Sequence, residues 1–317
     1  MIRFTIRTVG LSAITIFLSS IVVFIGVRSL PGDPALVLAG EQATPELLKA
    51  IREEFGLDKP LWVQYVTYIG QLLRGNLGIS TRNNVPVTAI LLQRLPVTLE
   101  LAGLAIVIGV VIGLTAGVIS AVRQGKFADY LATGFGLVGL SVPSFWLGLL
   151  AILVFSVNLH IFPASGFVPF PVDPLANLRG MILPALVLGI GLSAVLMRQT
   201  RSALLGELSA DYVRTARSKG MGKATEVRHA LRNSLTTVVT VLGLQLGGLI
   251  GGAIVTEQIF VLPGFGKLMI DSVGARDYPV LEGAVLMAVT AYIIVNLVVE
   301  LAYAYLNPRM RLSGTSE

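Results

Sequence analysis

The sequence predicts an all-α integral membrane protein with six transmembrane helices, both termini in the cytoplasm and a helical extracytoplasmic cap between helices 1 and 2. Hydrophobic residues make up 54% of the 317 residues. Only 13% are charged, about half of the roughly 25% that is typical of soluble domains. The charges also lie between long apolar runs, which is the pattern of a chain that crosses a bilayer several times.

Four charge-free apolar runs are long enough for a bilayer crossing of roughly 20 residues. They are Thr8–Val27, Leu101–Val122, Tyr130–Leu159 and Asn233–Thr256. Two shorter runs, Gly180–Met197 and Gly283–Val299, are close to the minimum of about 17 residues. We therefore expect six spanning helices.

The basic residues predict the orientation, because Lys and Arg accumulate in cytoplasmic loops. If the N-terminus is cytoplasmic, that side carries Arg3, Arg7, Arg123, Lys126, the eight basic residues from Arg198 to Arg232, Arg309 and Arg311. The opposite short loops carry Arg179, Lys267 and Arg276. Both termini are then cytoplasmic, and the net charge of +6 reflects topology instead of nucleic-acid binding.

These boundaries divide the chain into four parts. They are an N-terminal tail with the first span (1–29), an extracytoplasmic helical segment (30–96), a core of helices 2–6 (97–306) with a cytoplasmic loop at 198–233, and a cytoplasmic tail (307–317). In the extracytoplasmic segment, Thr44 is a good N-cap, Pro45 suits the first helical position, and apolar residues recur at helical spacing. A second amphipathic helix is expected from about Trp62 to Leu73.

Glycines recur every fourth residue in two of the predicted spans. The stripes are Gly109, Gly113 and Gly117, and Gly243, Gly247 and Gly251. Such stripes let helix backbones approach closely, and they also suit helices that slide between two packings. Static packing is the simpler alternative.

Several kinds of chemistry are disfavoured by missing motifs. The chain has no GxxxxGK[ST] phosphate loop, no HExxH and no GxSxG, so we expect neither ATP hydrolysis by this chain nor a metal site or serine hydrolase site. It has no cysteine. The two histidines, His160 and His229, lie on opposite sides of the membrane in this topology. We expect a non-catalytic membrane subunit without a cofactor of its own.

The most unusual segment is 211-DYVRTARSKGMGKATEVRHALRN-233, a charged stretch in an apolar chain. Apolar and small residues recur in it at spacings of three and four, flanked by Arg and Lys. Gly220 and Gly222 suggest two short helices joined by a turn. A basic amphipathic helix could simply lie on anionic lipid, and that alternative stays open from the residues alone.

The same segment resembles the cytoplasmic coupling loop, the EAA loop, of ABC importer permeases of the dipeptide, oligopeptide and nickel group. The matching strings are 212-YVRTARSKGMGK-223 and 229-HALRN-233. Further matches are 28-RSLPGDPA-35, 140-LSVPSFWLGLL-150, 257-EQIFVLPGFGKL-268, 276-RDYPV-280 and 307-NPRMR-311. Arg214 replaces the leading acid of the Glu-Ala-Ala pattern. The long segment after the first span is similar to that of the first permease of such pairs.

The resemblance implies a type I importer in a bacterial cytoplasmic membrane. Its partners would be a second homologous permease, two cytoplasmic ATPases that bind ATP and Mg²⁺, and an extracytoplasmic substrate-binding protein. The ATPase-coupling residues would be Val213, Arg214, Thr215, Ala216, Arg217, Lys219, Gly220 and Met221. The small and apolar members would enter a groove on the ATPase, while Arg214, Arg217 and Lys219 would set the register through charge complementarity.

The substrate pathway is predicted from polar residues in or next to the spans. The candidates for the pathway or an outer gate are Ser141, Ser144, Gln245, Glu257, Pro263, Gly264 and Asn296. Each could equally hold helices together. Di- or oligopeptides are the expected substrates, with nickel chelates or glutathione as alternatives. An ATP-independent secondary transporter or channel, and a membrane scaffold, are the rival functions.

Overall fold

The computed structural model describes residues 2–30, 34–39, 43–54 and 56–306. Within these residues the regular structure is helical, and the one β feature is an isolated bridge between Ile79 and Pro86. The predicted cytoplasmic tail lies outside the described residues. The described helices form two units, one from the residues up to 98 and 263–297, and one from residues 99–262 and 298–306.

Five continuous helices are long and apolar enough to cross a membrane. Their spanning portions are Phe4–Arg28, Val87–Val122, Pro174–Leu208, Lys223–Ile259 and Tyr278–Leu301. A bent pair of helices raises the number to six if the pair is one span. Most of these helices continue beyond the predicted apolar runs, because a helix can project into water where its polar residues are solvated. One of them starts at Val87, before the predicted core boundary at residue 97.

The third predicted span is not continuous, which corrects the expectation for Tyr130–Leu159. Helix α6 (Phe127–Ser141) ends at Val142, and α7 (Ser144–Ala151) with the π-helix η2 (Ile152–Asn158) continues at an angle of 105°. Pro143 has no N–H to donate and forces the residue before it into extended backbone. Val142 has φ −85° and ψ 125°, so the proline ends the helix.

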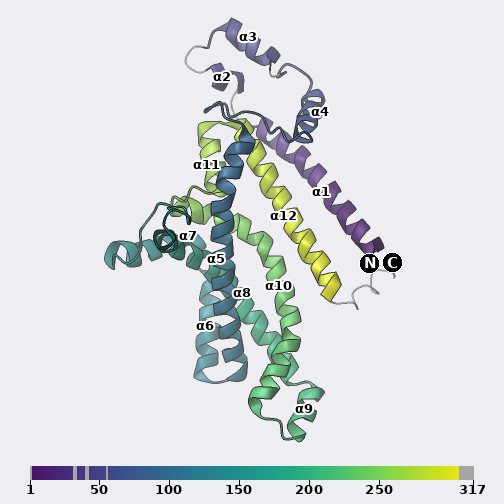
Figure 1. Ribbon diagram of the computed structural model, residues 1–317, viewed down its shortest axis with the longest axis vertical. Helices are drawn as coiled ribbons and strands as arrows, with labels where there is room; N and C mark the ends of the chain where they lie inside the picture. The colour runs from purple at the N-terminus through teal and green to yellow at the C-terminus, as the bar shows by residue number, and fades with distance from the viewer. Residues whose placement is uncertain (1, 31–33, 40–42, 55, 307–317) are drawn as a thin grey trace. The chain divides into compact units, whose positions relative to one another are not determined.

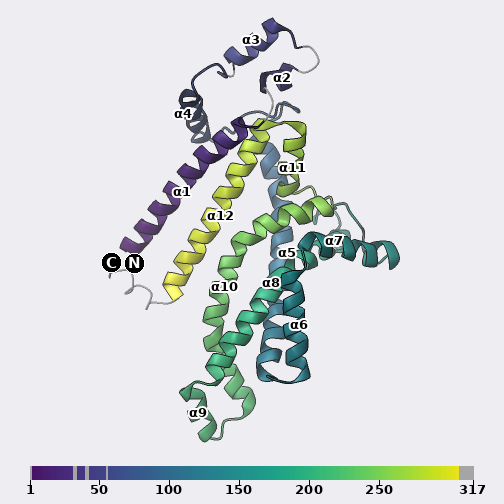
Figure 2. The same ribbon diagram turned by 180° about the vertical axis from the view of Figure 1, so that it is seen from behind.

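The first unit contains α1 (Ile2–Arg28), the start of α5 (Val87–Val122), α11 (Phe265–Ala275) and α12 (Tyr278–Leu306) as far as Leu297. Helices α1 and α12 run side by side (Figures 1 and 2). They share an apolar cluster of Val23, Val27, Leu281 and Leu286. A second cluster of Val87, Leu91, Phe265, Val280 and Ala284 joins the start of α5 to α11 and α12.

The segment after α1 is helical, as predicted. It holds α2 (Pro34–Ala39), α3 (Pro45–Glu54) and α4 (Leu61–Leu72). Thr44 caps α3 as expected, because its hydroxyl accepts a hydrogen bond of 3.2 Å from the backbone N–H of Leu47. The Tyr65 hydroxyl of α4 lies 2.8 Å from that of Ser20 in α1, so α4 is fastened to the first span.

The second unit is built around α8 (Pro174–Leu208), the most buried of the spanning helices. It packs against α6, α7 and α10 (Lys223–Ile259) and against α5. A Cβ added to Gly113 or Gly117 of α5 would lie 2.8 Å from a backbone carbonyl oxygen of α8. This confirms the close backbone approach predicted for the first glycine stripe.

Candidate functional site

The helix α9 (Asp211–Ser218) lies between the end of α8 and the start of α10 (Figures 1 and 2). It ends in a Schellman motif: Gly220 N–H donates to the Arg217 carbonyl at 3.0 Å and Met221 N–H donates to the Ala216 carbonyl at 3.2 Å. Gly220 has φ +76°, a left-handed conformation that favours glycine. The chain then turns directly into α10.

The prediction of a second short helix after Gly222 is wrong. Residues 223–259 form one continuous helix of 37 residues, because Lys223–Arg232 has no helix-breaking residue before the apolar run begins. The amphipathic start of α10 is therefore the end of a spanning helix. This start is joined to the rest of α10 without a break.

Val213 anchors α9 to the rest of its unit. Its side chain is only 1% exposed and packs in a cluster with Ala121 of α5, Leu204 of α8 and Ala230 of α10. The apolar side chain of Val213 is thus packed inside the chain, and its predicted role in contact with an ATPase stays a prediction. The buried side chain of Val213 therefore holds the N-terminal half of α9 against α5, α8 and α10.

A polar contact fastens the first turn of α9 to α8. The Tyr212 hydroxyl donates a hydrogen bond of 2.6 Å to Oε2 of Glu207. Burial, and then this bond to a carboxylate, raise the pKa of the Tyr212 hydroxyl above its usual value. The hydroxyl therefore stays protonated and remains a donor.

An ion pair fastens the last turn of α9 to α10. Arg217 Nη2 lies 3.0 Å from Oε2 of Glu226, and Nε lies 3.3 Å from both carboxylate oxygens. The Glu226 side chain is 8% exposed and that of Arg217 is 65% exposed. Hydrogen bonds to this carboxylate raise the pKa of the Arg217 guanidinium above its usual value, so the pair is fully ionised.

The other predicted coupling residues form an exposed surface. Arg214, Thr215, Lys219, Gly220 and Met221 are exposed, and Ala216 is half-buried. Arg214 approaches Asp211 at 3.9 Å, but both side chains are almost fully solvated, so this contact is weak. We name the exposed set Arg214, Thr215, Lys219, Gly220 and Met221 the α9 surface. It combines positive charge with one exposed methionine.

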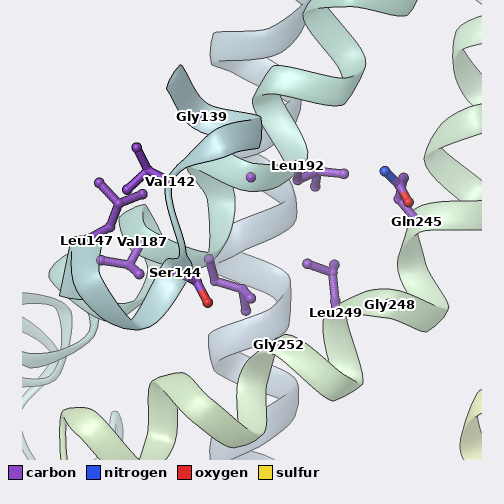
Figure 3. Close-up of a pocket in the computed structure, with 12 residues that line it drawn as sticks. Gly139, Val142, Ser144, Leu147, Val187, Leu192, Gln245, Gly248, Leu249 and Gly252 are labelled. Atoms are coloured by element: carbon purple, nitrogen blue, oxygen red, sulfur yellow. The ribbon is translucent and has the colours of Figure 1, made fainter. Parts of the chain in front are cut away.

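The second feature of this unit is a pocket between the α6–α7 elbow, α8 and α10. Its volume is about 240 Å³. Ser144 of α7 and Gln245 of α10 bring a hydroxyl and a carboxamide to its lining, beside the glycines Gly139, Gly248 and Gly252 (Figure 3). The polar groups are uncharged, so the pocket can form hydrogen bonds with a neutral polar group such as a peptide unit.

Comparison with known proteins decides the family. Residues 87–312 match the family described as "binding-protein-dependent transport system inner membrane component", and residues 1–102 match the N-terminal region of the same kind of membrane component. The chain belongs to this family. The permease is thus a multi-pass protein of a bacterial inner membrane, and the predicted resemblance to importer permeases is confirmed.

Individual relatives match the permease over almost its full length. The dipeptide transport system permease protein DppB of Escherichia coli (strain K12) is 41% identical over 98% of this chain and 99% of its own. A Brucella abortus (strain 2308) protein, named for a peptide transport system permease, is 42% identical over 92% of this chain and 93% of its own. DppB of Alkalihalophilus pseudofirmus is 38% identical, covering 92% and 94%.

A solved structure matches the fold. The crystal structure of an amino acid ABC transporter with histidines superposes with a TM-score of 0.50 at 20% identity, over 70% of the permease and 94% of that chain. This likeness shows the fold alone.

The remaining predicted pathway residues of the permease do not line the pocket. Ser141 ends α6 beside the elbow, and Glu257 is fully buried in α10. Pro263, Gly264 and Asn296 belong to the first unit. There the Pro263 carbonyl accepts a hydrogen bond of 3.3 Å from Arg94 Nη1, and Gly264 is the N-cap residue of α11. Their proposed role at an outer gate stays a prediction.

One polar cluster of the permease was not predicted from the sequence. Asp129 of α6 is paired with Arg201 of α8, whose Nε and Nη2 lie 2.8 and 2.9 Å from its two carboxylate oxygens. The Ser120 hydroxyl and the Gly125 N–H also donate to Asp129. The two partners are far apart in sequence and each sits near the end of an apolar run. No local pattern therefore signals the pair.

Proposed function

We propose that the permease is the membrane subunit of an ATP-driven ABC importer for di- and oligopeptides, and that α9 receives the movement of partner ATPases. The observation that carries this proposal is the position of α9. A short helix with an exposed basic face is fastened to the ends of two spanning helices. A partner that moves the α9 surface would move α8 and α10 together.

The substrate class is proposed from the names of the relatives. They describe dipeptide or peptide transport, which supports peptides over nickel chelates or glutathione. The pocket agrees with this choice in its chemistry, because Ser144 and Gln245 offer donors and acceptors without a net charge. A pathway that contacts the peptide backbone can accept many side chains.

The arrangement in the membrane is proposed from the basic residues. Positive charge in the loops supports cytoplasmic termini and a cytoplasmic α9. Helices α2, α3 and α4 then lie outside as a cap, where an extracytoplasmic substrate-binding protein delivers its ligand. A second homologous permease forms the other half of the pathway. Two ATPase subunits bind ATP and Mg²⁺ and dock beneath the two permeases, one of them on the α9 surface. This chain itself is not catalytic.

The transport step in this proposal is alternating access. Closure of the ATPases on ATP displaces α9, and the helices rock between inward-open and outward-open packings. The close contacts of α5 with α8 at Gly113 and Gly117 support movement of those two helices as one body. The pocket at the α6–α7 elbow would change shape as α10 tilts, because α10 supplies Gln245 and Gly248.

The decisive experiment is purification of the tagged chain from its native membrane, followed by identification of the proteins that accompany it. We expect a second permease and ATPases. The double variant Lys219→Glu/Met221→Asp should lose the ATPases and keep the second permease, since it reverses the charge and polarity of the α9 surface. The control Lys126→Glu changes an exposed lysine in another turn on the same predicted side and should keep both.

Transport by reconstituted vesicles separates this proposal from its rivals. ATP inside vesicles should drive uptake of labelled dialanine in the presence of the binding protein. Uptake that follows an ion gradient without ATP would support a secondary transporter or channel instead. A chain that arrives without ATPases and transports nothing would support a scaffold.

A further inference from the structure

We propose that Arg217 and Glu226 are positioning residues: their ion pair is an internal brace that fixes the angle between α9 and α10. This inference rests on the proposed function of α9, and it assigns to Arg217 a partner within its own chain. Of the three basic residues predicted to set the register on an ATPase, only Arg214 and Lys219 then keep that role.

Helix α9 is too short to be stable by itself. It has 8 residues, whereas isolated helices shorter than about 12–15 residues are marginal in water. Its N-cap residue, Ala210, gives no side-chain cap. Contacts with α8 and α10 must therefore keep it helical and oriented.

Two contacts other than the ion pair also hold α9 in place. Val213 fastens the buried side of α9 to the apolar cluster, and Tyr212 fastens its first turn to Glu207 of α8. Both contacts lie in the N-terminal half of α9. Without a third contact the C-terminal half could swing about Val213, and the pair Arg217–Glu226 supplies this third contact.

The Glu226 carboxylate has its hydrogen-bonding partner in Arg217. Glu226 is 8% exposed, and a buried carboxylate needs a charged or hydrogen-bonding partner. Arg217 supplies both Nε and Nη2 in a planar fork, which fixes orientation as well as distance. Lys223 on α10 also lowers the cost of the Glu226 charge, but a lysine on the same helix does not link α10 to α9.

The two arginines of α9 differ in their surroundings. The Arg214 side chain is 84% exposed. Its nearest carboxylate, that of Asp211, lies 3.9 Å away and is also almost fully exposed. The Arg214 guanidinium is therefore available to a partner. Arg217 directs its donors to Glu226. A force on α9 then reaches Glu226 in the first turn of α10 and, through one continuous helix, Gln245 in the pocket.

The test uses the reconstituted importer with labelled dialanine and compares Arg217→Glu, Glu226→Arg and the reciprocal double variant. Each single variant should retain bound ATPases and hydrolyse ATP. Its uptake should fall about tenfold, which lies within the usual range of coupling effects between two sites. The double variant should restore most of the uptake, because it rebuilds the pair with reversed charges. Arg217→Lys should be intermediate, since lysine lacks the planar fork.

The matched control is Arg214→Glu, which makes the same charge change on the same helix. It should weaken ATPase retention, and Glu226→Arg should not rescue it. Loss of ATPases in Arg217→Glu, or failure of the double variant to restore uptake, would overturn the brace. A wild-type complex without ATPases or ATP-driven uptake would instead overturn the proposed function.

A second measurement reports the angle directly. The chain has no cysteine, so spin labels at Ser218→Cys and Arg232→Cys, both exposed, report the distance between α9 and α10 within the complex. We expect a narrow distribution of distances between the labels in the otherwise unchanged chain and a broad one with Arg217→Glu. The distribution should be narrow again in the double variant Arg217→Glu/Glu226→Arg. Identical distributions in all three would contradict the brace.

Discussion

At the residue scale, the buried pair Asp129–Arg201 shows how one carboxylate can join three parts of a membrane protein. The Asp129 side chain is 6% exposed and accepts hydrogen bonds from Arg201, Ser120 and Gly125. These donors come from α8, α5 and the turn between α5 and α6. Because each donor satisfies part of one charge, loss of the carboxylate would leave several groups without a partner.

We predict that Asp129→Asn lowers the free energy of unfolding by about 2–4 kcal/mol, because removing one partner of a buried pair strands the other. Arg201 is 31% exposed, so water reduces the cost for its side. The measurement is the midpoint of thermal unfolding of the purified permease. Asp271→Asn is the control, since Asp271 is half exposed beside Lys267, and it should change stability by about 0.5 kcal/mol or less. Equal shifts for both variants would contradict the role of Asp129.

At the element scale, two glycines are needed for different reasons, one for its backbone conformation and the other for close packing between helices. Gly220 ends α9 in open space at φ +76°, so its importance lies in the conformation of its own backbone. Gly117 of α5 has an ordinary helical conformation but lies against the backbone of α8. The same residue type thus serves a turn in one place and a helix contact in the other.

We predict that Gly220→Ala destabilises the end of α9 by about 1 kcal/mol, the cost of a side chain in the left-handed region. ATP-driven uptake should fall accordingly. Gly222→Ser is the matched control. Gly222 also has open space around it, but it is the N-cap of α10 with φ −69°, where serine is favourable. Uptake that falls equally in both variants would show that the conformation of Gly220 is not the cause.

We predict that Gly117→Val reduces stability by about 1–3 kcal/mol through overpacking. A Cβ at Gly117 would lie 2.8 Å from the Met197 carbonyl oxygen, which cannot move without shifting α8. Gly103→Val in the same helix has no atom within 4 Å and should be tolerated. Thermal unfolding and expression level of the two variants give the comparison. Tolerance of Gly117→Val would mean that α5 and α8 pack less closely.

At the whole-molecule scale, the apolar helices and the family together show a multi-pass inner-membrane permease. Helix α9 is its proposed cytoplasmic contact with ATPases. The absence of cysteine from the sequence makes the proposed orientation directly measurable. A single introduced thiol then reports one position.

We predict that Asp58→Cys, in the exposed turn before α4, reacts with a membrane-impermeant maleimide added to intact spheroplasts. Lys219→Cys, at the end of α9, should react only after the membrane is permeabilised. Both positions are exposed, so a lack of reaction reports the membrane and not burial. The reverse pattern would invert the orientation and place α9 outside, away from any cytoplasmic ATPase.

The sequence by itself determined the class of protein, most of its spans and the existence of α9. Long apolar runs, a local basic stripe and N-cap residues such as Thr44 are patterns within a few turns of one segment. The structure they predict depends mainly on interactions within that segment, so it can be predicted from the sequence. Even the break at Pro143 had a local cause, which the length of the surrounding apolar run obscured. Only the tertiary structure decided which side chains of α9 are available: Val213 is buried, Arg217 is paired with Glu226, and Arg214 is free to solvent. The same holds for Asp129 and Arg201, because a pairing between distant residues depends on how the helices pack, and no pattern along the chain encodes it.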